Sequence, residues 1–170
     1  MAIYVPPTYD RTDDSLIFLA GPIQGALRWQ NKAAELIEEI APELNIASPR
    51  YIGEDQKIIG DYYPEEKPHS QIDWETYHLN KAGEKGVVLF WLAKESIHFC
   101  NRAFAQASRN ELGRWEEKNK NRKSKVVVGI EDGFSGKGYI EYTLSTEYPN
   151  IPVLYNLEET CQKSIELCNK

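Results

Sequence analysis

The sequence predicts an α/β fold in which helices cover both faces of an open parallel sheet. Along the 170-residue chain, short apolar runs alternate with longer segments whose apolar residues recur at helical spacing. The clearest run, "GVVLFWLA" at residues 86–93, is hydrophobic at consecutive positions, as a strand buried on both faces should be. Buried strands that alternate with helices are typical of a parallel sheet.

The elements follow one another in a regular order. Residues 1–14 contain adjacent prolines and are expected to form an extended arm ahead of the fold. Strands are expected at residues 15–21, 45–49, 86–93, 125–131 and 151–156. Helices are expected within residues 28–44 (ended at Pro42), 70–86, 108–118, 139–148 and 157–168. With no repeat and no linker, residues 1–170 are expected to form a single domain.

An open parallel sheet of five such strands is flavodoxin-like or Rossmann-like. Ligands of these sheets bind beyond the C-terminal strand ends, where the strand order reverses. The loops at that edge would be "AGPIQG", "PRYIGEDQ", the segment ahead of Glu111, and "EDGFSGKG". Candidate ligand-binding residues are therefore sought in these loops and in the helix turns beside them.

Composition excludes several classes of function. A net charge of −6 argues against a nucleic-acid polymer as partner, because phosphate contacts need clustered Lys and Arg. The first residues lack the basic start and the apolar run of a signal peptide. No apolar stretch approaches the ~20 residues that span a bilayer. The cysteines, three in number, lack metal-ligand spacing and are read as free thiols. A cytoplasmic protein without a bound metal is expected.

Glu111 has two interpretations. "SRNE" at residues 108–111 fits a capping box, in which Glu111 bonds back to the backbone N–H of Ser108. The same helix N-terminus would also keep a carboxylate ionised and suited to nucleophilic attack. Gly113, inside the predicted helix, suggests that something packs closely against this turn.

Other carboxylates lie in or beside the same loops. Asp73 is expected to close a capping box with Ser70, and Glu75 follows it on the same helix. Most such carboxylates are solvated or complement helix dipoles. Two that converge on a pocket would instead suit the cleavage of a glycosidic bond, with one as nucleophile and the other as acid.

Several segments, taken in order, resemble the nucleoside 2-deoxyribosyltransferase-like family. They are "IFLAGPI", "WQNKA", "SPRY…EDQ", "QIDWETYHL", "VVLFW" and "ASRNELGRW", between about residues 17 and 142. The resemblance implies a flavodoxin-like fold in which the Glu of the E-L-G motif attacks C1′ of a 2′-deoxynucleoside. Glu111 would then be the nucleophile, Gly21 and Pro22 would border the site, and Gln56 would contact the base. It also implies a homo-oligomer whose subunits complete each other's sites.

The sequence departs from the compact transferases at two positions. Where they carry aspartates, this chain has Ala105, six residues before Glu111, and His78 in the preceding helix. The departures resemble a divergent subgroup, for which the resemblance does not separate transfer from hydrolysis. The expected substrate-binding residues are Gly21, Pro22, Gln56, His78, Arg102, Arg109 and Asn110. Arg102 and Arg109 would bind a 5′-phosphate, or would be plain surface arginines.

We therefore predict an enzyme that cleaves or exchanges the N-glycosidic bond of a (deoxy)nucleoside or nucleotide, without a cofactor. Glu111 would form the covalent glycosyl intermediate, and Asp73 or Glu75 would hydrogen-bond the sugar or protonate the leaving base. A free base or water would resolve the intermediate. Alternatives are a non-catalytic nucleotide-binding module and an N-glycoside hydrolase of deoxynucleoside monophosphates or of NAD.

Overall fold

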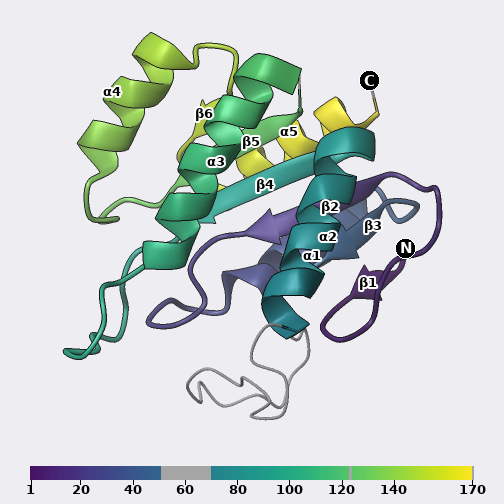
Figure 1. Cartoon of the computed structure of the whole chain (residues 1–170), viewed down its shortest axis with the longest axis horizontal. Helices are drawn as coiled ribbons and strands as arrows, with labels where there is room; N and C mark the ends of the chain where they lie inside the picture. Colours follow the sequence, from purple (N-terminus) through teal and green to yellow (C-terminus); the bar gives the residue numbers. More distant parts are fainter. Residues whose placement is uncertain (51–69, 123, 170) are drawn as a thin grey trace.

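The computed structural model describes residues 1–50, 70–122 and 124–169. Within them, six parallel strands form one sheet in the order β1-β3-β2-β4-β5-β6 (Figure 1). The strands are β1 (Ile3–Tyr4), β2 (Leu16–Ala20), β3 (Asn45–Ala47), β4 (Val87–Leu92), β5 (Val126–Ile130) and β6 (Val153–Leu154). The helices are α1 (Trp29–Ile40), α2 (Ser70–Lys85), α3 (Gln106–Arg122), α4 (Lys137–Glu147) and α5 (Leu157–Cys168).

The strand order confirms the predicted flavodoxin-like α/β fold. From β2 the chain first adds β3 on one side, and then adds β4, β5 and β6 on the other. This is the 2-1-3-4-5 order of flavodoxin-like sheets, with β1 as an additional edge strand beside β3. The winding direction reverses between β2 and β4, so the crevice of such sheets lies at the C-terminal ends of these two strands.

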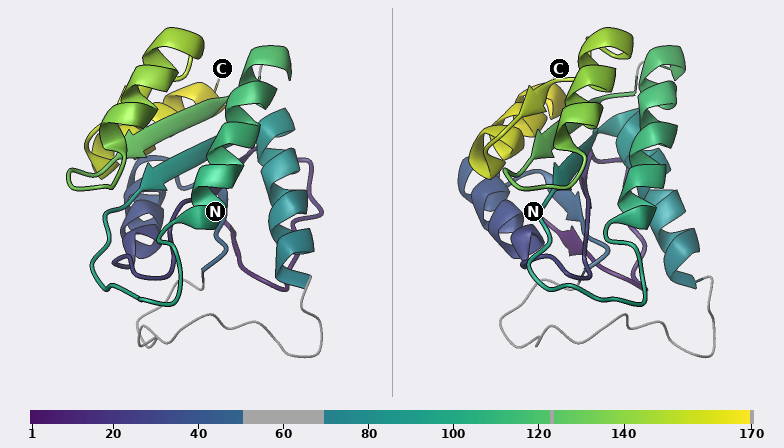
Figure 2. Two further views of the ribbon diagram at one scale, coloured as in Figure 1. Left: turned by 60° about the vertical axis from the view of Figure 1, so that its left-hand side comes forward. Right: turned by 90° about the vertical axis from the view of Figure 1, so that its left-hand side faces the viewer.

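Helices cover both faces of the sheet, as predicted. α2, α3 and α4 lie on one face, and α1 and α5 lie on the other (Figure 2). Every residue of β4 is buried, and neighbouring residues face opposite layers. Phe90 belongs to the same apolar cluster as Trp115 of α3, whereas Leu89 belongs to the cluster that contains Ile37 of α1. Strands without a polar face therefore require both helix layers.

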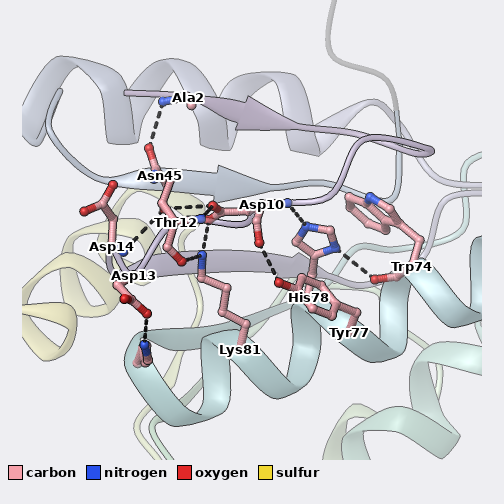
Figure 3. A network of polar contacts seen from close by, with 11 residues as sticks. Ala2, Asp10, Thr12, Asp13, Asp14, Asn45, Trp74, Tyr77, His78 and Lys81 are labelled. Atoms are coloured by element: carbon pink, nitrogen blue, oxygen red, sulfur yellow. Dashed lines mark hydrogen bonds and ion pairs between the residues drawn. The ribbon is translucent and has the colours of Figure 1, made fainter.

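The N-terminal arm is an integral part of the fold. β1 pairs in parallel with β3, with Ile3 opposite Ile46. The arm then runs along α2, where Asp10 is fully buried (Figure 3). The expectation of five strands behind an extended arm is corrected to six, because a two-residue strand is too short to show a periodic pattern.

Side chains of α2 hold this arm in place. The Trp74 indole N–H donates to the Thr8 carbonyl oxygen at 2.6 Å. The Tyr77 hydroxyl donates to the Asp10 carbonyl oxygen at 2.7 Å. Lys81 forms an ion pair with the Asp10 carboxylate at 2.5 Å, and the two side chains are only 8% and 0% exposed. Burial alone would raise the pKa of Asp10, but Lys81 and hydrogen bonds within the arm outweigh it, so this pKa lies below its ordinary value.

His78 joins the arm to α2 through both ring nitrogens. Its Nδ1 lies 2.9 Å from the Trp74 carbonyl oxygen, and its Nε2 lies 3.0 Å from the Asp10 backbone nitrogen. A carbonyl only accepts and a backbone N–H only donates, so the ring is neutral with its proton on Nδ1. Burial lowers the pKa of His78, which agrees with a neutral ring.

The buried ion pair between Lys81 and Asp10 yields a stability prediction. Replacing Lys81→Met should lower the free energy of unfolding by about 3–5 kcal/mol, because Asp10 then stays buried without its counter-ion. Urea unfolding followed by circular dichroism measures the loss. Lys85→Met is the matched control. Lys85 lies on the same helix as Lys81, but its ion pair with Asp13 of the arm is exposed, so its loss should lower the free energy of unfolding much less. Equal losses of unfolding free energy in the two variants would contradict the stabilising role of the buried ion pair between Lys81 and Asp10.

Two helical glycines should respond to alanine in opposite ways. A Cβ on Gly83 of α2 would lie 2.3 Å from the Trp115 ring of α3, so Gly83→Ala should destabilise by about 1–3 kcal/mol. A Cβ on Gly113 would meet no atom of the described residues within 4 Å, so Gly113→Ala should stabilise by about 1 kcal/mol. The inference that Gly113 marks close packing is therefore wrong; Gly83 has that role. Thermal unfolding of both variants tests the contrast.

Candidate functional site

The capping box predicted for Glu111 is wrong, because α3 starts before Ser108. The helix begins at Gln106, and the Arg109 N–H donates to the Ala105 carbonyl oxygen at 3.0 Å. Ser108 is therefore a buried residue inside the first turn. Ala105 precedes the helix with a φ of 56°, a left-handed conformation that alanine rarely adopts. An alanine at this position gives no sequence signal of a helix start.

Glu111 consequently lies in the second turn of α3, where the helix dipole has largely faded. The sequence suggested that the helix N-terminus keeps this carboxyl group ionised, but the structure places the group too far from that end. Burial raises the pKa of Glu111 to about 7, with a further increase from the charge of Glu75 and a partial decrease from Arg114. At neutral pH the group therefore exchanges a proton easily.

Glu111 and Glu75 line one small cavity between α3 and α2. The two helices lie side by side on the same face of the sheet (Figure 2). The cavity has a volume of about 50 Å³, enough for one or two water molecules. Its other lining side chains include the buried Leu79 and Trp115 and the cationic Lys118. The structure thus brings together two carboxyl groups that are 36 residues apart in the sequence.

The two carboxyl groups can supply an acid and a base at the same place. Burial raises the pKa of Glu75 as well, although a hydrogen bond from Gln71 Nε2 to Glu75 Oε1, 3.0 Å long, opposes this. Like charges in one site do not ionise independently, so the pair titrates as a unit. The charge of Glu75 contributes to the raised pKa of Glu111, so the protonation of one carboxyl group depends on that of the other.

The pair lies toward the edge of the sheet at which ligands bind in this fold. α2 and α3 each follow a loop that leaves the C-terminal end of a strand, β3 and β4 respectively. Their first turns therefore lie at that edge, and both carboxylates lie in the second turn. The pair thus lies within the helix layer, one turn from the C-terminal strand ends.

The Gly21-Pro22 turn is buried at the end of β2. Gly21 has a φ of 151°, and a Cβ there would lie 2.2 Å from the Trp91 carbonyl oxygen of β4. Only glycine fits this contact. The Trp29 indole N–H donates to the Pro22 carbonyl oxygen at 2.9 Å. The turn therefore has a structural role in joining β2, β4 and α1 at the edge where ligands bind.

The remaining predicted residues do not gather around the cavity. Asp73, Arg102 and Asn110 are exposed, and none of them lines it. His78 lies on the arm side of α2 with both ring nitrogens occupied, so the structure gives it a structural role in place of the expected contact with substrate. Gln56 lies outside the described residues.

Arg109 is engaged by the loop that follows β5. Its Nη2 donates to the Ser135 carbonyl oxygen and to the Ser135 hydroxyl, each at 2.7 Å. Its guanidinium also lies 4.5 Å from the centre of the Phe134 ring. This arginine therefore links the start of α3 to the loop between β5 and α4, and part of its hydrogen-bonding capacity is already used.

Two residues of functional interest were missed in the sequence. Arg50 directly follows the "SP" that ends the second predicted strand, and its position at a strand end was an available signal. Gln30 gives no such signal. It lies on the sheet-facing side of α1, and its complete burial follows from helix packing.

Metal ligands and membrane spans were also sought. Across residues 1–50, 70–122 and 124–169, no group of three or more His, Cys, Asp or Glu side chains is arranged to hold a metal ion. In the same ranges, no helix combines the length and the apolar character needed to cross a bilayer.

Replacing Glu75→Gln should lower the pKa of Glu111 from about 7, because the like charge disappears while burial remains. The folded-state pKa lies above the ordinary value of 4.5, so Glu111 makes the wild-type fold less stable as pH rises from about 4.5 to about 7. In the Glu75→Gln variant, the pH range over which Glu111 lowers the stability of the fold should be narrower. Carbon-13 NMR titration of the carboxyl groups and unfolding at several pH values test both effects. Asp73→Asn, which removes an exposed carboxylate from the same helix, should leave the pKa of Glu111 unchanged.

Comparison with known proteins adds no relative. No protein-family model matches the chain, and no curated protein matches its sequence significantly.

Proposed function

We propose that this protein cleaves or exchanges the N-glycosidic bond of a nucleoside or nucleotide, with Glu111 as nucleophile. One observation carries the proposal: Glu111 and Glu75 share a cavity near the ligand-binding edge, and burial raises the pKa of both. A carboxylate and a carboxylic acid in one site are the groups that a double-displacement glycosidase requires. The ordered resemblance of the sequence to nucleoside 2-deoxyribosyltransferases supports the nucleoside as substrate class.

In the first step, an ionised Glu111 attacks C1′ and forms an ester bond to the sugar. The C1′–N bond breaks, and its electron pair passes to the leaving base. Glu75 donates its proton to the base nitrogen and becomes a carboxylate. We assign this proton to Glu75 rather than to Asp73, because Glu75 lines the cavity whereas Asp73 is exposed and does not.

In the second step, an acceptor attacks C1′ and releases Glu111 as a carboxylate. Glu75 removes the proton of the acceptor, so both groups return to their initial states. A water molecule as acceptor completes a hydrolysis, and the N–H of a second base completes a transfer. Because the cavity of about 50 Å³ holds water but not a nucleoside, base and sugar would lie outside it, against the strand ends.

The size of the cavity also favours a second candidate function, a non-catalytic nucleotide-binding module. Sites that enclose a ligand of drug size have volumes of roughly 300–1,000 Å³. Ala105, in place of an expected aspartate, removes one further acid from the neighbourhood of Glu111. Binding of a nucleotide without any release of base would identify the module.

Release of base tests the proposed mechanism. The protein is incubated with each deoxynucleoside and deoxynucleoside monophosphate, with and without a second free base, and the products are separated by liquid chromatography. Glu111→Gln should abolish the reaction, and Glu75→Gln should slow it about 100-fold or more. The rate should fall in acid, because burial raises the pKa of Glu111 to about 7 and protonation removes the nucleophile.

Asp73→Asn is the control for the loss of a carboxylate from α2 outside the cavity, and it should keep the wild-type rate. If wild-type protein releases no base from any of these compounds, or if Glu111→Gln retains full turnover, the mechanism is wrong. A mass increase of Glu111 by one sugar, trapped with a slow substrate, would be direct support.

A further inference from the structure

Arg50 is a buried cation without an acidic partner among the described residues. It lies three residues after the end of β3 and exposes only 8% of its surface. The Nη1 group donates one long hydrogen bond, 3.5 Å, to the Ile23 carbonyl oxygen in the loop between β2 and α1. No carboxylate among residues 1–50, 70–122 and 124–169 forms an ion pair with it. Buried arginines are almost always paired, so the isolation of this one requires an explanation.

The surroundings of Arg50 add positive charge instead of neutralising it. Burial lowers the pKa of Arg50, and the nearby charge of Arg28 lowers it further. Arg28 is itself the N-cap residue of α1, and the first turn of that helix contains no acidic side chain. The positive end of the helix dipole therefore adds to the charge of the Arg50 guanidinium group. This electrostatic environment favours a bound anion.

An independent observation comes from Gln30 in the first turn of α1. The residue is 0% exposed, and neither its Nε2 nor its Oε1 has a hydrogen-bond partner. In the loop just ahead of the helix, the buried Oε1 of Gln24 also lacks a partner. Buried amide groups are nearly always hydrogen-bonded, because an unsatisfied one loses its hydration without compensation. A ligand with acceptor oxygens would satisfy the Nε2 donor of Gln30.

The loop between β2 and α1, which carries Gln24 and accepts the hydrogen bond from Arg50, is held firmly in place. The Gly25 carbonyl oxygen accepts hydrogen bonds from the Ser96 backbone N–H at 2.6 Å, from the Ser96 hydroxyl at 2.9 Å and from the Ile97 N–H at 3.1 Å. These bonds fasten the loop between β2 and α1 to the loop between β4 and α3. The loop between β2 and α1, which accepts the Arg50 hydrogen bond at Ile23, is thus braced and needs little reorganisation when a ligand binds.

We propose that Arg50, the N-terminus of α1 and the amide of Gln30 form a binding subsite for a phosphate group. The guanidinium and the helix N–H groups would donate to the phosphate oxygens, as helix N-termini and arginines commonly do. That this phosphate belongs to a nucleotide substrate rests on the proposed function; the anion subsite itself does not. Arg50 is better suited to this role than Arg109, whose Nη2 already bonds Ser135.

Binding measured without turnover tests the subsite. Isothermal titration calorimetry with inorganic phosphate, and then with each deoxynucleoside monophosphate and its unphosphorylated deoxynucleoside, is carried out on wild type and Arg50→Met. We expect Arg50→Met to bind phosphate and monophosphates about 10- to 100-fold more weakly, and to bind the deoxynucleosides as wild type does. Stronger binding of free phosphate than of any monophosphate would identify inorganic phosphate as the ligand; the reverse would identify the nucleotide.

Lys32→Met is the matched control, since it removes an exposed cation from the same helix and should leave phosphate binding unchanged. Gln30→Met, which keeps nearly the same volume, should weaken phosphate binding by a smaller factor. Without phosphate, Arg50→Met should melt at or above the wild-type temperature, because a buried uncompensated charge is removed.

Three results would overturn the subsite: no phosphate or monophosphate binding to wild type, equal binding by Arg50→Met, or an Arg50→Met protein that is less stable than wild type without anion. The last result would show that Arg50 stabilises the fold instead of binding an anion. None of these measurements depends on base release. A failure of the proposed chemistry is therefore distinguishable from a failure of the subsite.

Discussion

The fold depends on central strands that have no face suited to water. β2, β4 and β5 are buried along their whole length, so each face of the sheet must be covered by helices. That requirement places α1 and α5 on one face and α2, α3 and α4 on the other. It also determines where chemistry is available, because every helix on the sheet starts near the C-terminal strand ends and brings its first turns to the same edge.

α2 connects the scaffold to the candidate site. Trp74, Tyr77, His78 and Lys81 of this helix hold the N-terminal arm, whereas Glu75 faces α3 and Glu111. Close contact between the two helices is possible because Gly83 leaves room for the Trp115 ring. The same packing partly buries Glu75 and Glu111, and this burial raises the pKa of Glu75 and raises that of Glu111 to about 7. Stability and candidate chemistry thus depend on one helix interface.

Residue patterns predicted much of the fold but less of the site. Consecutive apolar residues revealed β2, β4 and β5, and the alternation of strands with helices predicted the flavodoxin-like sheet, which the strand order confirms. β1 escaped detection because two residues carry no period. The start of α3 was misplaced because Ser108 resembles a cap, while the helix in fact begins behind an alanine with a positive φ. His78 was expected to contact substrate, although its surroundings, contributed by an arm 68 residues away, make it structural.

The sequence by itself determined the class of the fold, and it placed three candidate carboxylates, Asp73 and the glutamates Glu75 and Glu111, in or beside the strand-end loops. These follow from local hydrophobic patterns and from the order of the elements along the chain. Only the tertiary structure decided that these two glutamates share a cavity, that Lys81 neutralises Asp10, and that Arg50 and Gln30 are buried without partners. Burial and charge pairing are properties of segments that meet in space, and no spacing within one segment records them.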